Sequence, residues 1–359
     1  MKTFEFGMSK VSDQGPCYVI AEIGNNHQGD LKTALKMIKV AAGMGVDAVK
    51  FQKRDNKSLF TKAMYNKPYD NENSYGATYG EHRDFLEFGW DEYVELMQCA
   101  QDNEVELLCT PFDFNSVDFL ERLGITGYKT ASADLTNVPL LTYIAKLGKP
   151  IFVSTGACSL EEIRRSYEAM RKYNDKICLL HCTSGYPTEY ENLNLRAIET
   201  LKHVFPDAAI GYSGHDYGIL APSVAYMLGA TVIEKHFTLN RSWKGTDHKF
   251  SLEPTGLHKM IRDLRRIDVS LGDGNKEVRD FEKDARVKMG KSLYTVRALK
   301  AGKVLTKDDI AIKSPGGGIP AAEFDAIIGQ RLRVDLLEDT SLSHDHLYWE
   351  QKVSAAAES

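Results

Sequence analysis

The sequence predicts an α/β fold, a (β/α)8 TIM barrel followed by a small β-rich domain. Over about the first 270 residues, short β-branched runs alternate with amphipathic segments of helical periodicity. An open doubly wound sheet is the alternative, but no G-x-G-x-x-G motif follows the first expected strand. Beyond residue 290 the pattern changes to short alternating strands with turn glycines and prolines.

The barrel prediction depends on eight expected strands, each followed by a helical segment. Residues 30–45 and 159–173 are two of the expected helices, and Ser159 with Glu162 has the spacing of a capping box. A last helix closes the series near residue 272. The expected strands occupy residues 17–24, 47–52, 106–112, 127–132, 150–156, 177–183, 208–215 and 231–238.

These elements divide the chain into three parts. Residues 1–272 are the expected catalytic barrel, and residues 273–290, which are charged and contain glycine, are the expected linker. Residues 291–352 are the expected small domain. A long polar and aromatic loop, about residues 53–90, follows the second strand, where substrate-covering elements of barrels usually lie.

The composition limits the classes of binding partner that we expect. The chain of 359 residues carries 45 basic and 50 acidic side chains without long runs, which argues against nucleic acid as the main partner. No apolar leader and no stretch near the ~20 apolar residues of a membrane span are present. We therefore expect a soluble, cytoplasmic protein without a membrane partner. Its six cysteines show no C-x-x-C pair and are expected to be reduced and structural.

Polar residues gather where the expected strands end. The stretch VIEKHFTLN, residues 232–240, begins like a buried strand and then continues with two charged residues and a histidine. Burying unpaired charge is costly, so these side chains need a site or partners. The carboxyl ends of barrel strands form such a site. The residues expected there are Glu22, Lys50, Gln52, Thr110, Lys129, Ser132, Ser213, His215, Glu234 and His236.

Two histidines among them suggest a metal site. His215 and His236 end neighbouring strands, so their imidazoles can reach one point and hold a divalent ion with several open positions. A barrel histidine standing alone is more often structural.

Two lysines suggest a phosphate site. Lys50 and Lys129, with nearby strand-end hydroxyl groups, form a cradle suited to a phosphate. The alternative is that both lysines pair with strand carboxylates, namely Glu22 and Glu234. The hydroxyl groups belong to Thr110, Ser132 and Ser213.

Several motifs together resemble the sialic acid synthase family. They are AEIGNNHQGD, VKFQK, YGEHRDFLEF, HCTSGYPT, IGYSGHDYG, VIEKHFTL and WKGTDHKFSLEP, followed by KSPGGGIPAAEF. The resemblance covers nearly the whole chain, with the motifs in order. It implies a TIM barrel joined to a carboxy-terminal antifreeze-like (SAF) domain. It also implies a domain-swapped homodimer, although Ser314 stands where many bacterial members have an arginine that reaches the partner's sugar site.

The resemblance implies condensation of phosphoenolpyruvate with N-acetylmannosamine or its 6-phosphate, giving N-acetylneuraminate or its 9-phosphate, and phosphate. By position, His215 and His236 resemble ligands of a divalent metal, Mn2+ or alternatively Mg2+ or Co2+. The implied catalytic residues are Glu22, His236 and Asp247. The implied substrate-binding residues are Lys50, Gln52, Thr110, Lys129, Ser132, Tyr186, Ser213 and Glu234.

Other functions stay open at this point. A related nonulosonate synthase of the legionaminate, pseudaminate or KDN type is the alternative, because the resemblance is less specific for the individual substrate than for the family. A Schiff-base aldolase would use Lys129 or Lys235 as its nucleophile and need no metal. A non-catalytic glycan-binding protein would release no phosphate from phosphoenolpyruvate.

Overall fold

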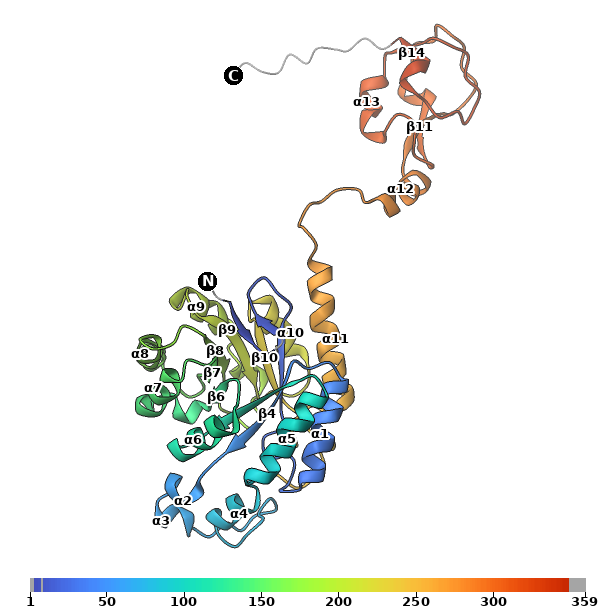
Figure 1. Ribbon diagram of the computed structural model, residues 1–359. Coiled ribbons are helices and arrows are strands. Elements are labelled where there is room, and N and C mark those ends of the chain that lie inside the picture. Colours follow the sequence, from blue (N-terminus) through green and yellow to red (C-terminus); the bar gives the residue numbers. More distant parts are fainter. Residues whose placement is uncertain (1–2, 8, 349–359) are drawn as a thin grey trace. The chain divides into compact units, whose positions relative to one another are not determined.

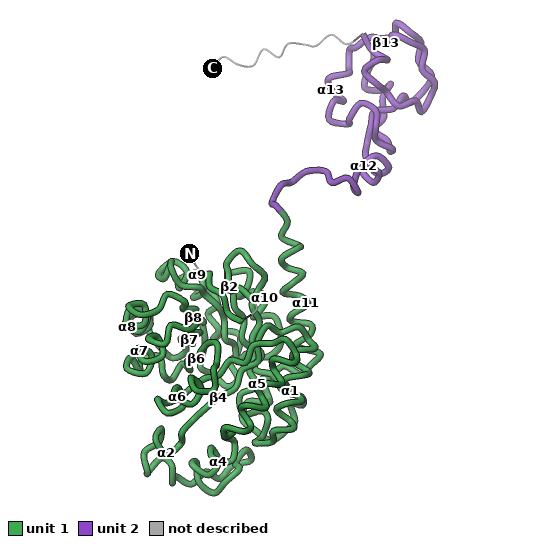
Figure 2. The backbone as a smooth tube through the Cα atoms, viewed as in Figure 1, with its two compact units in different colours: residues 1–272 green, residues 273–359 purple. Residues whose placement is uncertain are grey.

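The computed structural model describes residues 3–7 and 9–348, and the chain divides at Gly272 into two compact units (Figure 2). The first unit comprises residues 1–272 and the second begins at Asp273. The last residues of the expected small domain, 349–352, lie outside the described residues.

The first unit contains the predicted barrel. Eight parallel strands close on themselves, and each strand pairs with its neighbours along the chain, with the last strand returning to the first (Figure 1). The predicted (β/α)8 fold is therefore confirmed. In barrel order the strands are β3 (Tyr18–Glu22), β4 (Ala48–Lys53), β5 (Glu106–Pro111), β6 (Tyr128–Thr130), β7 (Ile151–Ser154), β8 (Ile177–Cys182), β9 (Ala209–Gly214) and β10 (Val232–His236).

Helices cover the outside of this barrel (Figure 1). Their amphipathic faces pack on the outward side chains of the strands, as helices in such barrels must to bury an apolar stripe. The expected capping box of Ser159 and Glu162 opens α8, as predicted. The helices are α1 (Leu31–Gly43), α5 (Trp90–Asp102), α6 (Phe114–Leu123), α7 (Val138–Lys146), α8 (Leu160–Arg171), α9 (Ala197–Val204), α10 (Leu220–Met227) and α11 (Pro254–Leu271).

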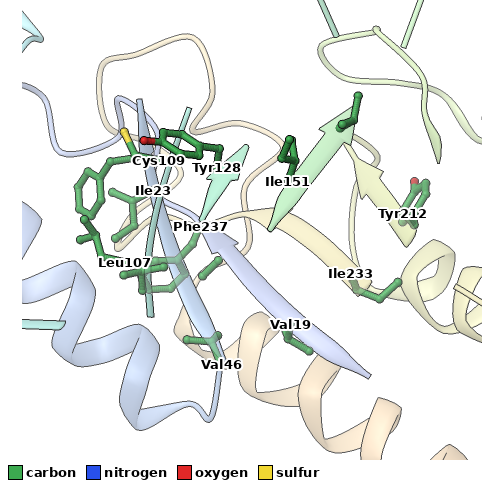
Figure 3. Close-up of a cluster of buried hydrophobic side chains, with 14 of the residues drawn as sticks. Val19, Ile23, Val46, Leu107, Cys109, Tyr128, Ile151, Tyr212, Ile233 and Phe237 are labelled. Atoms are coloured by element: carbon green, nitrogen blue, oxygen red, sulfur yellow. The ribbon is translucent and has the colours of Figure 1, made fainter. Parts of the chain in front are cut away.

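Side-chain alternation along each strand separates two apolar regions. One side of the strands, including Val19, Tyr212 and Ile233, packs in the layer between barrel and helices (Figure 3). The other side fills the lower interior of the barrel, where Ile20 and Phe152 belong to a second apolar cluster. Apolar filling at this level leaves only the upper interior for polar side chains.

A hairpin that the sequence analysis did not predict covers the amino-terminal end of the barrel. Strands β1 (Phe4–Phe6) and β2 (Ser9–Val11) pair antiparallel. The rings of Phe4 and Phe6 contact Phe152 at centroid distances of 5.9 and 5.1 Å. These aromatic side chains fill the amino-terminal end of the barrel, which lies opposite the expected site.

The insertion after β4 is not the irregular loop expected. It contains three short helices, α2 (Asn56–Leu59), α3 (Lys62–Tyr65) and α4 (Tyr79–Phe85). Three hydrogen bonds attach it to the segment after β10. The Tyr75 hydroxyl donates to the Lys244 carbonyl at 2.7 Å, the Gly245 N–H donates to Asn73 Oδ1 at 3.0 Å, and Lys249 Nζ donates to Glu72 Oε1 at 3.4 Å. The insertion thereby covers one side of the barrel mouth.

The second unit has its own small apolar core, which includes Leu293, Ile319 and Leu342. Part of the expected linker is helical, since α12 spans Lys283–Met289. The remaining elements of this unit are β11 (Ser292–Thr295), β12 (Ile310–Lys313), α13 (Phe324–Ile327), β13 (Arg331–Leu332) and β14 (Leu347–Tyr348).

Among the described residues, no helix combines the length and apolar character that a membrane crossing requires.

Candidate active site

A cavity of about 850 Å³ lies at the carboxyl ends of the barrel strands. All twelve residues predicted for the site line it, so the structure brings the whole predicted set together. They are Glu22, Lys50, Gln52, Thr110, Lys129, Ser132, Tyr186, Ser213, His215, Glu234, His236 and Asp247.

Strand register explains why these residues share one cavity. Glu22 lies opposite Lys50 on β4 and opposite His236 on β10, while Glu234 lies opposite Ser213 on β9. Residues two apart along a strand face the same side, so the apolar interior below continues into this polar layer above. The position of each polar residue near the end of its strand therefore fixes its place in the cavity.

Lys50 is paired with carboxylate in the floor of the cavity. Its Nζ lies 2.9 Å from Glu22 Oε2 and donates to Thr110 Oγ1 at 3.1 Å. Gln52 Nε2 donates to the other Glu22 oxygen at 2.7 Å. This geometry is the alternative that the sequence left open, in which the lysine neutralises a strand carboxylate. The phosphate cradle stays a prediction.

Lys129 and Glu234 continue the charged network. Lys129 Nζ lies 3.9 Å from Glu234 Oε1 and donates to Ser154 Oγ at 2.5 Å. Glu234 Oε1 also accepts from Ser213 Oγ at 3.0 Å and lies 3.8 Å from Lys50 Nζ. Two ammonium groups and two carboxyl groups thus share the buried floor, which can hold an anion if a carboxyl group is protonated.

Burial and pairing shift the pKa values of these groups in different directions. Burial raises the pKa of Glu22, although Lys50 opposes that effect. Burial also acts to raise the pKa of Glu234, but Lys129 and Lys50 outweigh it and leave that pKa below its ordinary value. Burial lowers the pKa of Lys129 despite the nearby Glu234. Two carboxyl groups with separated pKa values can serve as distinct acid and base groups.

His215 and His236 meet at the side of the cavity, with ring centroids 5.3 Å apart. Burial lowers the pKa of His215 to about 4 and that of His236 to about 3, so both rings are neutral near pH 7. His215 Nδ1 lies 3.1 Å from the Thr183 carbonyl oxygen, and among the residues that the structure describes its Nε2 has no hydrogen-bond partner. Neutral imidazoles with a free nitrogen are the usual protein ligands of transition metals.

The residues present fit a metal with few protein ligands. The buried Nδ1 of His236 has no hydrogen-bond partner within the described chain and lies 3.8 Å from Asp247 Oδ2. Within the same described part, no group of three or more His, Cys, Asp or Glu side chains is arranged to hold a metal ion. Two imidazoles therefore fit an ion whose remaining positions are open to substrate and water.

The other predicted residues lie nearer the mouth. Tyr186 is 59% exposed, and its ring lies 4.2 Å from that of His215. Ser132 Oγ accepts a hydrogen bond from the Gly156 N–H at 2.9 Å. These positions suit contacts with substrate in the upper part of the cavity.

Lys235 does not line the cavity. It alternates with Glu234 and His236 and therefore faces the opposite side of β10, where its Nζ pairs with Asp216 Oδ1 at 3.0 Å. Of the two Schiff-base candidates, only Lys129 is in contact with the cavity.

The sequence analysis missed two cavity-lining arginines, Arg54 and Arg83. Arg54 directly follows β4 and was outside the strand-end pattern, while Arg83 lies on α4, in a segment expected to be a loop. Ser154, which accepts from Lys129, was also missed although it lies within the expected strand at residues 150–156 and ends β7.

Comparisons with known proteins agree with the fold and the motifs. The NeuB family matches residues 37–276, and the SAF domain matches residues 290–347. N-acetylneuraminate-9-phosphate synthase of Homo sapiens is 38% identical over 93% of this chain and 94% of that protein. N,N'-diacetyllegionaminic acid synthase of Legionella pneumophila is 36% identical over 92% of this chain and 94% of that protein.

A solved structure is similar as well. The crystal structure of N-acetylneuraminic acid synthetase from Leptospira borgpetersenii, in complex with citrate, has a TM-score of 0.69 and 33% identity, covering 79% of this chain and 94% of that one. A family match over most of the barrel and relatives above 30% identity define the class. The chain belongs to the NeuB family, which confirms the resemblance drawn from the motifs.

Proposed function

We propose that the protein is a sialic acid synthase that condenses phosphoenolpyruvate with N-acetylmannosamine or its 6-phosphate and releases phosphate. The observation that carries this proposal is the buried floor of two lysines and two glutamates beside a pair of neutral imidazoles. A synthase of the legionaminate, pseudaminate or KDN type is the alternative, and the relatives include both sialic and legionaminic acid enzymes.

Phosphoenolpyruvate would bind over the floor of the cavity. Lys50 and Lys129 supply the positive charge, and charge-assisted hydrogen bonds to phosphate are among the strong ones. The added negative charge next to Glu22 further favours the protonated form of that carboxyl group, whose pKa burial already raises. The remaining contacts come from Thr110, Ser132, Tyr186 and Ser213.

His215 and His236 would hold the divalent ion, Mn2+ or alternatively Mg2+ or Co2+, through their free ring nitrogens. When bound, such an ion supplies Lewis-acid polarisation of the sugar aldehyde. Asp247 Oδ2 lies 3.8 Å from His236 Nδ1, and in this proposal Asp247 orients sugar hydroxyl groups beside the reacting carbon.

The reaction forms one carbon–carbon bond, and oxygen from water replaces the phosphate oxygen at C2. C3 of the enol phosphate attacks the aldehyde carbon, protonated Glu22 gives its proton to the aldehyde oxygen, and positive character develops at C2. Water adds at C2 and returns a proton to Glu22, after which the tetrahedral intermediate expels inorganic phosphate and leaves the keto acid. Gln52 holds Glu22 by a 2.7 Å hydrogen bond, and Glu234 balances the two lysines.

A Schiff-base aldolase is a second candidate, because burial lowers the pKa of Lys129 in the cavity. Borohydride with substrate would trap a covalent adduct on Lys129 in that case. The synthase gives no adduct and loses activity with a chelator. A glycan-binding protein without catalysis would release no phosphate with any acceptor.

The acceptor is identified by measuring product formed with N-acetylmannosamine, its 6-phosphate, mannose 6-phosphate and a diamino-trideoxy hexose. Mass spectrometry then assigns the keto acid.

The family also suggests a homodimer in which the SAF domain caps the partner's barrel. Light scattering, which gives the molar mass in solution, tests this. Because phosphoenolpyruvate is a cytoplasmic metabolite, we place the reaction in the cytoplasm.

A further inference from the structure

Two arginines line the active-site cavity outside the charged floor, and the mechanism above does not use them. Arg54 directly follows β4, and Arg83 lies on α4 of the insertion. Both belong to the same 850 Å³ cavity as Lys50 and Lys129. The lysines lie on strands, within the barrel, whereas Arg83 comes from the segment that covers the mouth.

Arg54 is held in place before any ligand binds. The side chain is buried, its guanidinium lies 3.7 Å from the centroid of the Phe112 ring, and Nη2 donates to Gln52 Oε1 at 2.6 Å. Nη1 is buried and forms an ion pair with Glu87 Oε1 at 3.6 Å, but it has no hydrogen-bond partner in the described part of the chain. A fixed guanidinium with an unused N–H group can donate a charge-assisted hydrogen bond to an oxyanion.

Arg83 adds a second positive charge. Its Nε donates to the Tyr79 hydroxyl at 3.1 Å, and its guanidinium lies over the Tyr79 ring at 5.1 Å. No carboxylate forms an ion pair with Arg83 among the described residues. Burial and the nearby Arg83 both lower the pKa of Arg54. Two like charges at one cavity wall are stabilised by an anion bound between them.

We infer that Arg54 and Arg83 form a second anion site, which binds a phosphate monoester on the acceptor sugar at the end away from its aldehyde. The inference rests on the proposed function. Phosphoenolpyruvate over the floor places its reacting carbon towards the cavity mouth, so the acceptor lies between the floor and the insertion. The far end of the acceptor then reaches Arg54 and Arg83, and the 6-phosphate form is the preferred substrate.

The test compares kcat/KM for N-acetylmannosamine 6-phosphate with that for N-acetylmannosamine, at saturating phosphoenolpyruvate, in Arg83→Gln and Arg54→Gln. We expect the wild type to prefer the phosphorylated acceptor and each variant to reduce that preference by roughly tenfold to 100-fold. Arg54→Lys keeps the positive charge but lacks the planar guanidinium group, so its preference for the phosphorylated acceptor should lie between those of the wild type and Arg54→Gln. Arg122→Gln is the matched control, because Arg122 stacks on Trp90 at 5.2 Å but does not line the cavity, and it should keep the preference.

Equal efficiency with both acceptors in the wild type would overturn the inference, as would an unchanged preference in both variants. A rise confined to the KM for phosphoenolpyruvate would also overturn it, by assigning the arginines to that substrate. If no acceptor yields phosphate, the proposed function fails, and calorimetry still tests this site. Wild type should bind N-acetylmannosamine 6-phosphate more tightly than N-acetylmannosamine, and Arg83→Gln should lose the difference. If Arg54→Gln does not fold, Arg83→Gln alone carries the test.

Discussion

Lys235 and Asp216 form a fully buried ion pair, with Nζ and Oδ1 3.0 Å apart and neither side chain exposed. Asp216 follows His215 in the chain, and Lys235 precedes His236, so the pair joins the ends of β9 and β10 behind the two imidazoles. Tyr212 also donates to Asp216 Oδ1 at 2.7 Å. The charge within VIEKHFTLN therefore has two explanations, since Glu234 and His236 face the cavity while Lys235 has a partner on the other side.

Lys235→Met should lower the free energy of unfolding by about 3–5 kcal/mol, because Asp216 is left buried without its counter-charge. Urea denaturation followed by circular dichroism measures this. Asp216→Asn combined with Lys235→Met removes both charges and should recover part of the loss. Lys149→Met is the control, since its 2.8 Å pair with Glu121 is partly exposed and should contribute under about 1 kcal/mol. Equal losses in Lys235→Met and Lys149→Met would contradict the account.

Lys129→Ala should raise the KM for phosphoenolpyruvate by roughly tenfold to 100-fold, the equivalent of a lost charge-assisted hydrogen bond. Initial rates of phosphate release at saturating acceptor give the KM. Lys149→Ala, on the barrel exterior, should leave it unchanged. An unaltered KM in Lys129→Ala would remove this lysine from the phosphoenolpyruvate site.

Glu22→Gln should reduce kcat by roughly 10²- to 10⁴-fold, the usual contribution of a general acid or base. Glu22 starts the reaction protonated, so activity is present below its pKa and falls as the pH rises through it. Burial raises the pKa of Glu22, so this basic limb of the wild-type profile should lie above the ordinary glutamate value. A pH–rate profile of Glu22→Gln that keeps this limb would assign it to another group.

His236→Ala should lose binding of Mn2+, because only one imidazole is left at the site. Calorimetric titration with MnCl2 measures binding without turnover, and phosphate release should fall in parallel. His181→Ala is the control, since His181 Nε2 lies 2.8 Å from the Leu193 carbonyl oxygen and the side chain does not line the active-site cavity. Unchanged Mn2+ affinity in His236→Ala would place the metal elsewhere.

The sequence predicted the barrel because its strands are apolar runs separated by helices of clear periodicity. It did not predict β1 and β2, which have three residues each, or α2, α3 and α4, whose four to seven residues are too short for a periodic signal. The strand-end residues were predictable from one rule, that parallel strands direct their carboxyl ends to one face.

The ion pairs and hydrogen bonds within the site were not predictable from the sequence. Lys50 and Glu22 lie on the same side of adjacent strands, and sequence spacing alone does not tell whether Lys50 binds a ligand or pairs with Glu22. Arg54 and Arg83 were missed because neither ends a strand, and their shared cavity arises only when the insertion covers the barrel mouth.

The central claim is that this cavity joins phosphoenolpyruvate to an amino sugar. The most direct measurement is phosphate release from phosphoenolpyruvate in the presence of Mn2+, with and without N-acetylmannosamine or its 6-phosphate. The account predicts release only when acceptor is present, with one nine-carbon keto acid formed for each phosphate. Release that is independent of the acceptor, or no release with either sugar or with the other acceptors tested, would contradict it.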